Sequence, residues 1–230
     1  MEKIKEITVF FPCYNEENNI TGLVEQTVQI LNEIAEDYQI IIVNDGSTDQ
    51  TAEVAEELSA RFENVELINH ANNKGYGVAL KTGFLNSKKD LVFYTDGDNQ
   101  FDINELPKLI PLSKKYDIVS GYRIKRQDPF IRKINAGIYN IVLFLLFGLN
   151  IRDVDCAFKL YKRELFEKID LISDGALIDA EILIKAKKLG YSIGQTGVNH
   201  YPRTAGEQTG ANVNVIFRAF KEILKLRMKI

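Results

Sequence analysis

The sequence contains few cysteines and few histidines, with two of each among 230 residues. Cys13 and Cys156 are too few and too far apart to predict a disulfide framework. His70 and His200 have no metal-ligand spacing with either cysteine. These absences argue against a secreted disulfide scaffold and against a Cys/His metal centre. We therefore expect a protein of the reducing cytoplasm.

The sequence also lacks an excess of positive charge and an apolar leader. Its formal net charge is −3 and its pI is near 5.6, so the chain has no general attraction to nucleic acid. Residues 1–6 lack the apolar core of a signal peptide. We expect no nucleic-acid partner and no export, and any phosphate must be bound by locally placed Arg and Lys.

Two common nucleotide-binding motifs are missing. Neither the dinucleotide pattern G-x-G-x-x-G after the first strand nor the P-loop pattern G-x-x-x-x-G-K-[ST] occurs, which disfavours a Rossmann dehydrogenase and an ATPase. Gly75 and Gly77 instead open a predicted helix after the third strand. Two glycines at a helix N-terminus let backbone amides approach a phosphate, so phosphate binding there is expected.

Strand-like runs alternate with helical patterns through the first half of the chain. This alternation predicts βαβ units in one α/β domain, with a mostly parallel central sheet flanked by helices. The hydrophobic content of 45% permits a substantial core. The predicted strands are 7–11, 39–43, 65–68, 91–94 and 117–120, and the predicted helices are 19–35, 51–61, 77–85 and 105–115.

Two carboxylates end the fourth predicted strand. The apolar run from Leu91 to Tyr94 is followed by Asp96 and Asp98, which one glycine separates. Ligands of open α/β sheets bind at the carboxyl ends of the strands, and paired carboxylates suit a hard divalent cation that bridges to substrate phosphates. An Asp-Gly-Asp turn with solvated side chains would give the same residues. The pattern fits both a metal-dependent nucleotide site and a simple turn.

Polar loops follow the first two predicted strands, at residues 12–17 and 44–49. We expect both loops to face the crevice at Asp96. Asn15, Ser47 and Asp49 are also common turn formers and helix caps, and that interpretation suits Asp49 in particular. Asp45 follows a buried strand directly, so its carboxylate is a candidate acceptor for hydrogen bonds from a base or a ribose.

In combination, the motifs at residues 11–16, 43–49 and 96–100 resemble the inverting family-two glycosyltransferases of GT-A fold. Further matches at residues 121–123, 153–159 and 203–207 are similar to the polyprenyl-phosphate (dolichyl-phosphate) mannosyl- and glucosyltransferase branch. The resemblance covers residues 7–210. It implies transfer of a hexose from a UDP- or GDP-sugar to a polyprenyl phosphate, with Mg or Mn as cofactor.

The resemblance also implies roles for individual residues. The donor nucleoside would contact Pro12, Tyr14, Glu16 and Asp45, and the metal and diphosphate would be held by Asp96, Asp98 and Gln100. The phosphates of donor and acceptor would be bound by Arg123, Arg132 and Arg203. Guanidinium groups suit this task because they bind phosphate oxygens bidentately and stay charged. An ordinary surface arginine is the alternative for all three, and it suits Arg132 better than Arg123 or Arg203.

Asp179 and Glu181 are the candidates for a catalytic base. A hydroxyl acceptor needs a base, whereas a phosphate monoester has a second pKa of about 6 and is already largely ionised. Either carboxylate also suits the start of a helix that ends near Lys188, and this alternative is favoured for Glu181. The two open alternatives to the main hypothesis are transfer to a hydroxyl acceptor in glycan synthesis and a non-catalytic nucleotide-sugar-binding subunit.

Two segments suggest contact with a membrane. Residues 134–151 carry no charge, but they are diluted by Asn and Gly, which predicts a buried or interfacial helix rather than a span. The C-terminal run separates apolar from basic residues and predicts an amphipathic helix, either on anionic lipid or packed on the core. We expect a donor half (1–122), an acceptor half (123–210) and this helix (211–230), in a cytoplasmic protein peripheral to the membrane. Base, sugar and oligomeric state stay open.

Overall fold

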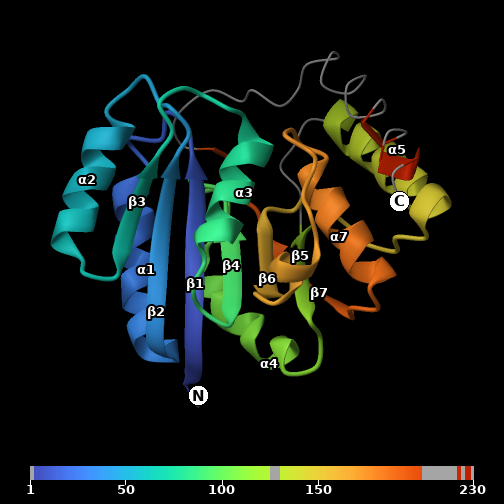
Figure 1. Ribbon diagram of the computed structural model, residues 1–230, viewed down its shortest axis with the longest axis horizontal. Coiled ribbons are helices and arrows are strands. Elements are labelled where there is room, and N and C mark those ends of the chain that lie inside the picture. The colour runs from blue at the N-terminus through green and yellow to red at the C-terminus, as the bar shows by residue number, and fades with distance from the viewer. Residues whose placement is uncertain (1–2, 125–129, 204–221, 224–225, 229–230) are drawn as a thin grey trace.

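A computed structural model describes residues 3–124, 130–203, 222–223 and 226–228. Its centre is a seven-stranded sheet of order β3-β2-β1-β4-β6-β5-β7 with helices on both faces (Figure 1). This confirms the predicted α/β fold class. The strands are β1 (Ile4–Cys13), β2 (Ala35–Asn44), β3 (Val65–Asn69), β4 (Leu91–Thr95), β5 (Ile118–Ile124), β6 (Phe158–Lys162) and β7 (Ile193–Asn199).

One strand, β6, runs against the direction of the other six. It pairs antiparallel with both β4 and β5, while the β1–β2, β1–β4, β2–β3 and β5–β7 pairs are parallel. Because Phe158 pairs with Thr95, β6 begins where β4 ends. The loop before β6 therefore reaches the same sheet edge as the loops that follow the parallel strands.

The helices cover the two faces of the sheet and fix which strand ends stay open. Helix α1 packs beside α2 and η1, and α3 packs on β1 and β2 from the opposite face, where α7 also lies (Figure 1). The helices are α1 (Ile20–Ile34), α2 (Thr51–Arg61), α3 (Tyr76–Asn86), the 3-10 helix η1 (Ile103–Lys108), α4 (Ile110–Ser113), α5 (Phe130–Phe147), α6 (Leu165–Lys168) and α7 (Ile178–Lys188).

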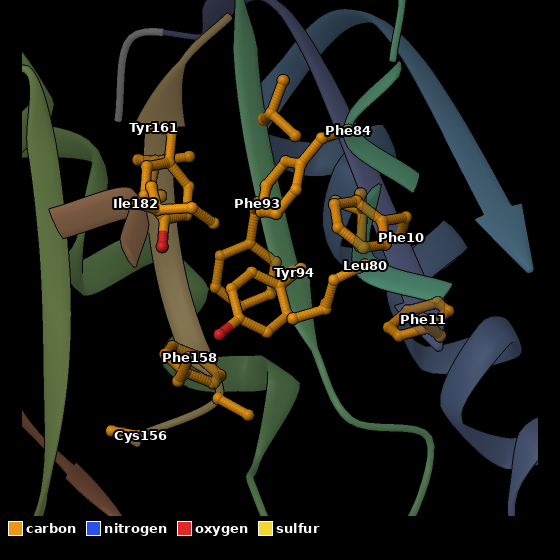
Figure 2. Packing of buried hydrophobic residues seen from close by; sticks show 14 of the residues in the cluster. Phe10, Phe11, Leu80, Phe84, Phe93, Tyr94, Cys156, Phe158, Tyr161 and Ile182 are labelled. Atoms are coloured by element: carbon orange, nitrogen blue, oxygen red, sulfur yellow. The ribbon is translucent and has the colours of Figure 1, made fainter. Parts of the chain in front are cut away.

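Aromatic rings join α3 to the sheet. Phe10 of β1 stacks on Tyr94 of β4 with ring centroids 5.5 Å apart, and Phe84 of α3 meets Phe10 edge-on at 4.8 Å (Figure 2). All three rings are buried. The close fit depends on Gly83, because a Cβ there would lie 2.2 Å from the Phe10 ring. This packing holds β1 and β4 together just below their polar carboxyl ends.

The predicted helix over 105–115 differs from what forms. The chain there makes the 3-10 helix η1, with Pro107 inside it, and then the single turn α4, with Pro111 near its start. Proline has no N–H to donate and clashes with the preceding turn, so a continuous α-helix is interrupted twice. The other three predicted helices form close to their expected bounds.

The uncharged segment 134–151 forms most of α5. One face of this helix carries exposed apolar side chains, called its bare face below. Ile138, Ile141, Phe144 and Leu145 are 48%, 59%, 52% and 73% exposed. No helix within the described ranges is long and apolar enough to cross a bilayer. The predicted C-terminal helix at 211–230 lies mostly outside the described residues. Within that range only 222–223 and 226–228 are described, and they are helical.

A candidate active site at the carboxyl edge of the sheet

A cleft of about 820 Å³ opens where β1, β2 and β4 end. It brings together residues far apart in sequence, as expected for the carboxyl edge of an open α/β sheet. The predicted site residues that line it are Pro12, Tyr14, Glu16, Asp45, Asp96, Asp98 and Arg203. Most of the predicted donor residues therefore share one cavity.

The loops after β1 and β2 are joined directly to each other. Asn15, in a left-handed conformation with φ 59°, donates its amide to Ser47 Oγ (3.0 Å) and accepts the amide of Thr48 at its side-chain oxygen (2.8 Å). Asp49 accepts the amide of Thr51 (3.0 Å) at the start of α2, the turn-forming role expected for it. These polar residues shape the cleft wall by bonding to one another.

Asp45 holds the glycine turn before α3. Its carboxylate accepts the backbone amides of Lys74 (2.9 Å) and Gly75 (2.8 Å), and Gly75 has φ +96°. The amide of Gly77 donates to the carbonyl of Asp174 (3.1 Å), and a Cβ on Gly77 would lie 2.4 Å from that backbone. The expectation that these amides are available to a phosphate is therefore wrong. The glycines are needed for backbone conformation and close approach.

The acidic pair after β4 lies in an environment that disfavours two negative charges. Burial, followed by the nearby charges of Asp98 and Asp179, raises the pKa of Asp96 well above its usual value. Burial also raises the pKa of Asp98. Asp96 Oδ1 is buried and has no hydrogen-bond partner within the described part of the chain. Two such carboxylates suit a hard cation, which would neutralise both and fill the open position on Asp96.

Arg203 reaches back across the cleft to the first loop. Its guanidinium donates to Glu16 Oε1, and its Nη1 lies 3.7 Å from Asp98 Oδ2. Glu16 also accepts from Asn19 Nδ2 at 2.7 Å. Burial raises the pKa of Glu16, although Asn19 and Arg203 act against that rise. Arg203 thus connects Glu16, a predicted contact of the nucleoside, to Asp98, a predicted metal ligand.

Arg123 and Gln100, predicted to bind phosphate and metal, are absent from the described lining of this cavity. Arg123 forms a bidentate pair with Asp153, with both N···O distances 2.7 Å. Gln100 donates its side-chain amide to the carbonyl of Tyr201 (3.1 Å). The side chain of Arg132 lies outside the described residues. The phosphate roles of Arg123 and Arg132, and the metal role of Gln100, stay predictions.

Asp179 is held in a buried ion pair. Lys159 Nζ lies 2.5 Å from Asp179 Oδ1, and the Tyr94 hydroxyl donates to the same oxygen. Lys159 is fully buried and also donates to the carbonyl of Cys156 (2.6 Å). These two contacts fix the position of the Asp179 carboxylate against β4 and β6.

The described hydrogen bonds of Glu181 go to the loop before α7 and to Lys185 of the same helix. It accepts the amides of Ile172 (2.9 Å) and Ser173 (2.7 Å), and Lys185 Nζ lies 2.6 Å away. Burial alone would raise the pKa of Glu181, but these hydrogen bonds, led by that of Lys185, lower it. Glu181 lies in the first turn of α7, the position its favoured interpretation gave it, and it also anchors the loop before that helix.

Two residues that contact predicted site residues were not identified from the sequence. Lys159 gives no sign of its pairing with Asp179, because it sits inside an apolar strand 20 residues away. His70 contacts Asp45, 25 residues away, although its spacing matches no motif. The first pairing joins β6 to α7, and the second joins the ends of the neighbouring strands β2 and β3.

The chain belongs to glycosyl transferase family 2, whose sequence profile matches residues 8–170. It is 32% identical over 169 residues to an undecaprenyl-phosphate 4-deoxy-4-formamido-L-arabinose transferase of Proteus mirabilis, which covers 72% of this chain and 52% of that protein. It is 30% identical over 213 residues to a dolichyl-phosphate beta-glucosyltransferase of Trichomonas vaginalis, covering 84% of this chain and 64% of the relative. The chain spans about half the length of the bacterial relative.

The fold is shared with solved structures at low sequence identity. One is glucosyl-3-phosphoglycerate synthase from Mycobacterium tuberculosis, crystallised with Mn²⁺, UDP and glucosyl-3-phosphoglycerate. It superposes with a TM-score of 0.77 at 16% identity, covering 96% of this chain and 80% of that one. The family and the GT-A-type fold expected from the motifs are confirmed.

Proposed function

We propose that this protein transfers a hexose, with inversion, from a nucleotide diphosphate sugar to a polyprenyl phosphate. The observation that carries the proposal is the cleft in which Asp45, the Asp96–Asp98 pair and Arg203 converge. Relatives named as undecaprenyl-phosphate and dolichyl-phosphate transferases support the same acceptor class.

Asp96 and Asp98 would hold a Mg²⁺ or Mn²⁺ ion in this proposal. The fit rests on the buried, open Oδ1 of Asp96 and on the burial of Asp98. A cation held by one or two carboxylates commonly completes its shell with substrate phosphates and water. When bound, it would stabilise negative charge on the departing diphosphate. Arg203, already 3.7 Å from Asp98, is placed to add a second positive charge there.

The state of Asp179 favours a phosphate acceptor over a hydroxyl acceptor. This candidate base is buried, paired with Lys159 and absent from the described lining of the cleft. A carboxylate whose oxygen is occupied by a lysine, outside the described lining of the cleft, is poorly positioned to take a proton from an acceptor hydroxyl. An acceptor phosphate is mostly ionised at neutral pH and needs no strong base.

Peripheral binding to an anionic membrane is the part of the proposal supported by α5. Its bare face carries Ile138, Ile141, Phe144 and Leu145, and such a face suits the boundary between headgroups and acyl chains. A lipid-linked acceptor would be presented at that surface. We propose that the protein lies on the cytoplasmic side of that membrane.

The test is sugar transfer with matched acceptors. Purified protein is given labelled UDP-glucose or GDP-mannose, with Mn²⁺, and either undecaprenyl phosphate or undecaprenol. We expect transfer from one donor to undecaprenyl phosphate and none to undecaprenol. Transfer to undecaprenol would favour the hydroxyl-acceptor alternative. Donor binding without transfer to either lipid would favour a non-catalytic subunit.

A further inference from the structure

Asp45 is held from behind by a histidine at the end of the next strand. His70 follows β3, and its Nδ1 lies 2.6 Å from Asp45 Oδ1. The Nε2 of the same ring lies 2.9 Å from Thr82 Oγ1 in α3. The side chains of His70 and Asp45 are only 6% and 5% exposed. The three residues form a chain of hydrogen bonds from the half-buried Thr82 of α3 to the wall of the cleft.

The partners of each group fix the direction of these bonds. Asp45 accepts two backbone amides, so it acts as an acceptor and His70 Nδ1 carries the proton between them. The Thr82 hydroxyl lies 3.0 Å from the carbonyl of Val78. It can donate there and accept from Nε2–H, or turn and donate to a bare Nε2. The Nδ1–H bond to Asp45 is kept in both cases.

The same carboxylate fixes the turn that lines the cleft beside it. Lys74 N bonds to Oδ1 and Gly75 N bonds to Oδ2. The turn also packs tightly on the loop after β2, because a Cβ on Gly46 would lie 2.3 Å from the Asn72 backbone. Asn73, Gly75 and Asp45 all line the cleft. Moving Asp45 would therefore move this whole wall.

The hydrogen-bond capacity of Asp45 points to a further use. Each carboxylate oxygen accepts about two hydrogen bonds. Oδ1 has two partners, His70 and Lys74, whereas the described residues give Oδ2 only the amide of Gly75. One acceptor position on Oδ2 is thus left for a donor group of a ligand in the cleft.

We propose that His70 is a positioning residue for the nucleoside end of the sugar donor. It acts through Asp45, holding the remaining acceptor position and the 73–75 turn in place for an N–H of the base or an O–H of the ribose. This inference rests on the proposed function, which supplies the nucleotide-sugar donor. It assigns His70 no contact with the diphosphate, which the acidic pair and Arg203 would bind at the other side of the cleft.

The test separates the nucleoside end from the phosphate end by calorimetry. The probes are UDP, GDP and inorganic pyrophosphate, each with Mn²⁺. His70→Phe removes both ring nitrogens from a ring of similar shape. We expect it to weaken binding of the preferred nucleotide about tenfold or more, the effect of losing a hydrogen bond to a charged group, and to leave pyrophosphate binding unchanged. His70→Asn, whose Nδ2 takes the place of the ring Nδ1 and can still donate to Asp45, should recover most of the nucleotide affinity.

A second comparison tests whether the effect passes through Asp45. In an Asp45→Asn background, His70→Phe should cause little further loss, because residues that act as a unit are not additive. If His70→Phe does not fold, His70→Asn is compared with His70→Gln, whose amide takes the place of Nε2 and faces Thr82 instead of Asp45. Equal loss of nucleotide and pyrophosphate binding, or no loss at all, would overturn the positioning role. If the unmodified protein binds pyrophosphate but neither nucleotide, the proposed function itself fails and takes this inference with it.

Discussion

At the scale of single residues, the acidic pair after β4 gives the sharpest test of the metal. Asp98→Asn keeps the size of the side chain and its bond from the amide of Gln100, but removes one charge. We expect the variant to stay folded and to lose metal-dependent turnover by about a thousandfold, because several kcal/mol of transition-state stabilisation are lost. The measurement is transfer rate against Mn²⁺ concentration, with thermal unfolding as the control for folding. Turnover near that of the unmodified protein would remove Asp98 from the metal site.

Arg203 tests the acceptor side of the same cleft. Arg203→Lys keeps a positive charge near Glu16 and Asp98 but loses the planar fork that binds phosphate bidentately. We expect transfer to polyprenyl phosphate to fall much more than nucleotide binding. The transfer rate is measured at limiting acceptor concentration. The affinity for nucleotide is measured separately by calorimetry. Full transfer by the variant under these conditions would show that the fork has no phosphate role.

The sequence predicts some residues of the cleft and misses others for a physical reason. Asp96, Asp98 and the loops at 12–17 and 44–49 directly follow apolar strand runs, so their place at one sheet edge follows from the strand pattern. The Asp45–His70 and Asp179–Lys159 pairs join separate elements. Which side chains meet in such pairs depends on sheet order and helix packing, which local sequence does not encode.

At the scale of elements, the contact of α3 with the sheet depends on a glycine, Gly83, which leaves room for an aromatic ring. Gly83→Ala places a Cβ 2.2 Å from the fully buried Phe10 ring. We expect the free energy of unfolding to fall by about 1–3 kcal/mol, the usual result of overpacking a core. Gly22→Ala in α1 is the matched control, because its Cβ would meet nothing within 4 Å. That change should stabilise the helix by about 0.5–1 kcal/mol. Urea unfolding of both variants measures the contrast, and equal shifts would refute it.

Asp117 lies just before β5 and bonds to the last residue of β6 and to the residue before β7. Lys162 Nζ lies 2.6 Å from Oδ1, while the amide and hydroxyl of Ser192 donate to Oδ2 at 2.9 and 2.7 Å. The hydrogen bond from Lys162, with those of Ser192, lowers the pKa of Asp117 to about 2. Water screens part of this interaction, because the Asp117 side chain is 25% exposed.

The lowered pKa of Asp117 predicts a dependence of stability on pH. An unfolded aspartate has a pKa of about 3.9, so the ionised form is favoured by folding. Its contribution is present above about pH 4 and disappears as the pH falls through about 2. Asp117→Asn should therefore cost about 0.5–1 kcal/mol at neutral pH and less near pH 3. Urea unfolding at the two pH values measures this. An equal cost at both would mean that the charge of Asp117 contributes nothing.

The elements themselves were predictable to different degrees. α2 forms over Thr51–Arg61, the range predicted, because its amphipathic pattern is uninterrupted. β7 was not predicted, since its sequence holds two glycines and several polar residues, and it is a strand because it pairs with β5. The helix expected over 105–115 breaks at Pro107 and Pro111. Tertiary pairing and proline thus account for these two differences.

At the scale of the whole molecule, the bare face of α5 predicts where a membrane would bind. Changing Ile141 and Leu145 together to serine removes two of its most exposed apolar side chains. We expect partitioning onto anionic vesicles to fall on the order of tenfold or more, because less apolar area is buried in lipid. Leu85→Ser is the control, since Leu85 is 76% exposed on α3, away from this face. Vesicle sedimentation measures all three proteins. Equal binding by all of them would separate α5 from the membrane.

The reversed strand β6 has a consequence for synthesis on the ribosome. The block β3-β2-β1-β4 lies entirely within the first 95 residues, whereas the strand that closes its β4 edge begins only at Phe158. A nascent chain therefore carries β4 with one row of backbone donors and acceptors unpaired while about sixty further residues are translated. Such an open, apolar edge is a template for pairing with another chain. The interval before Phe158 emerges is therefore when the β4 edge is open to pairing with another chain.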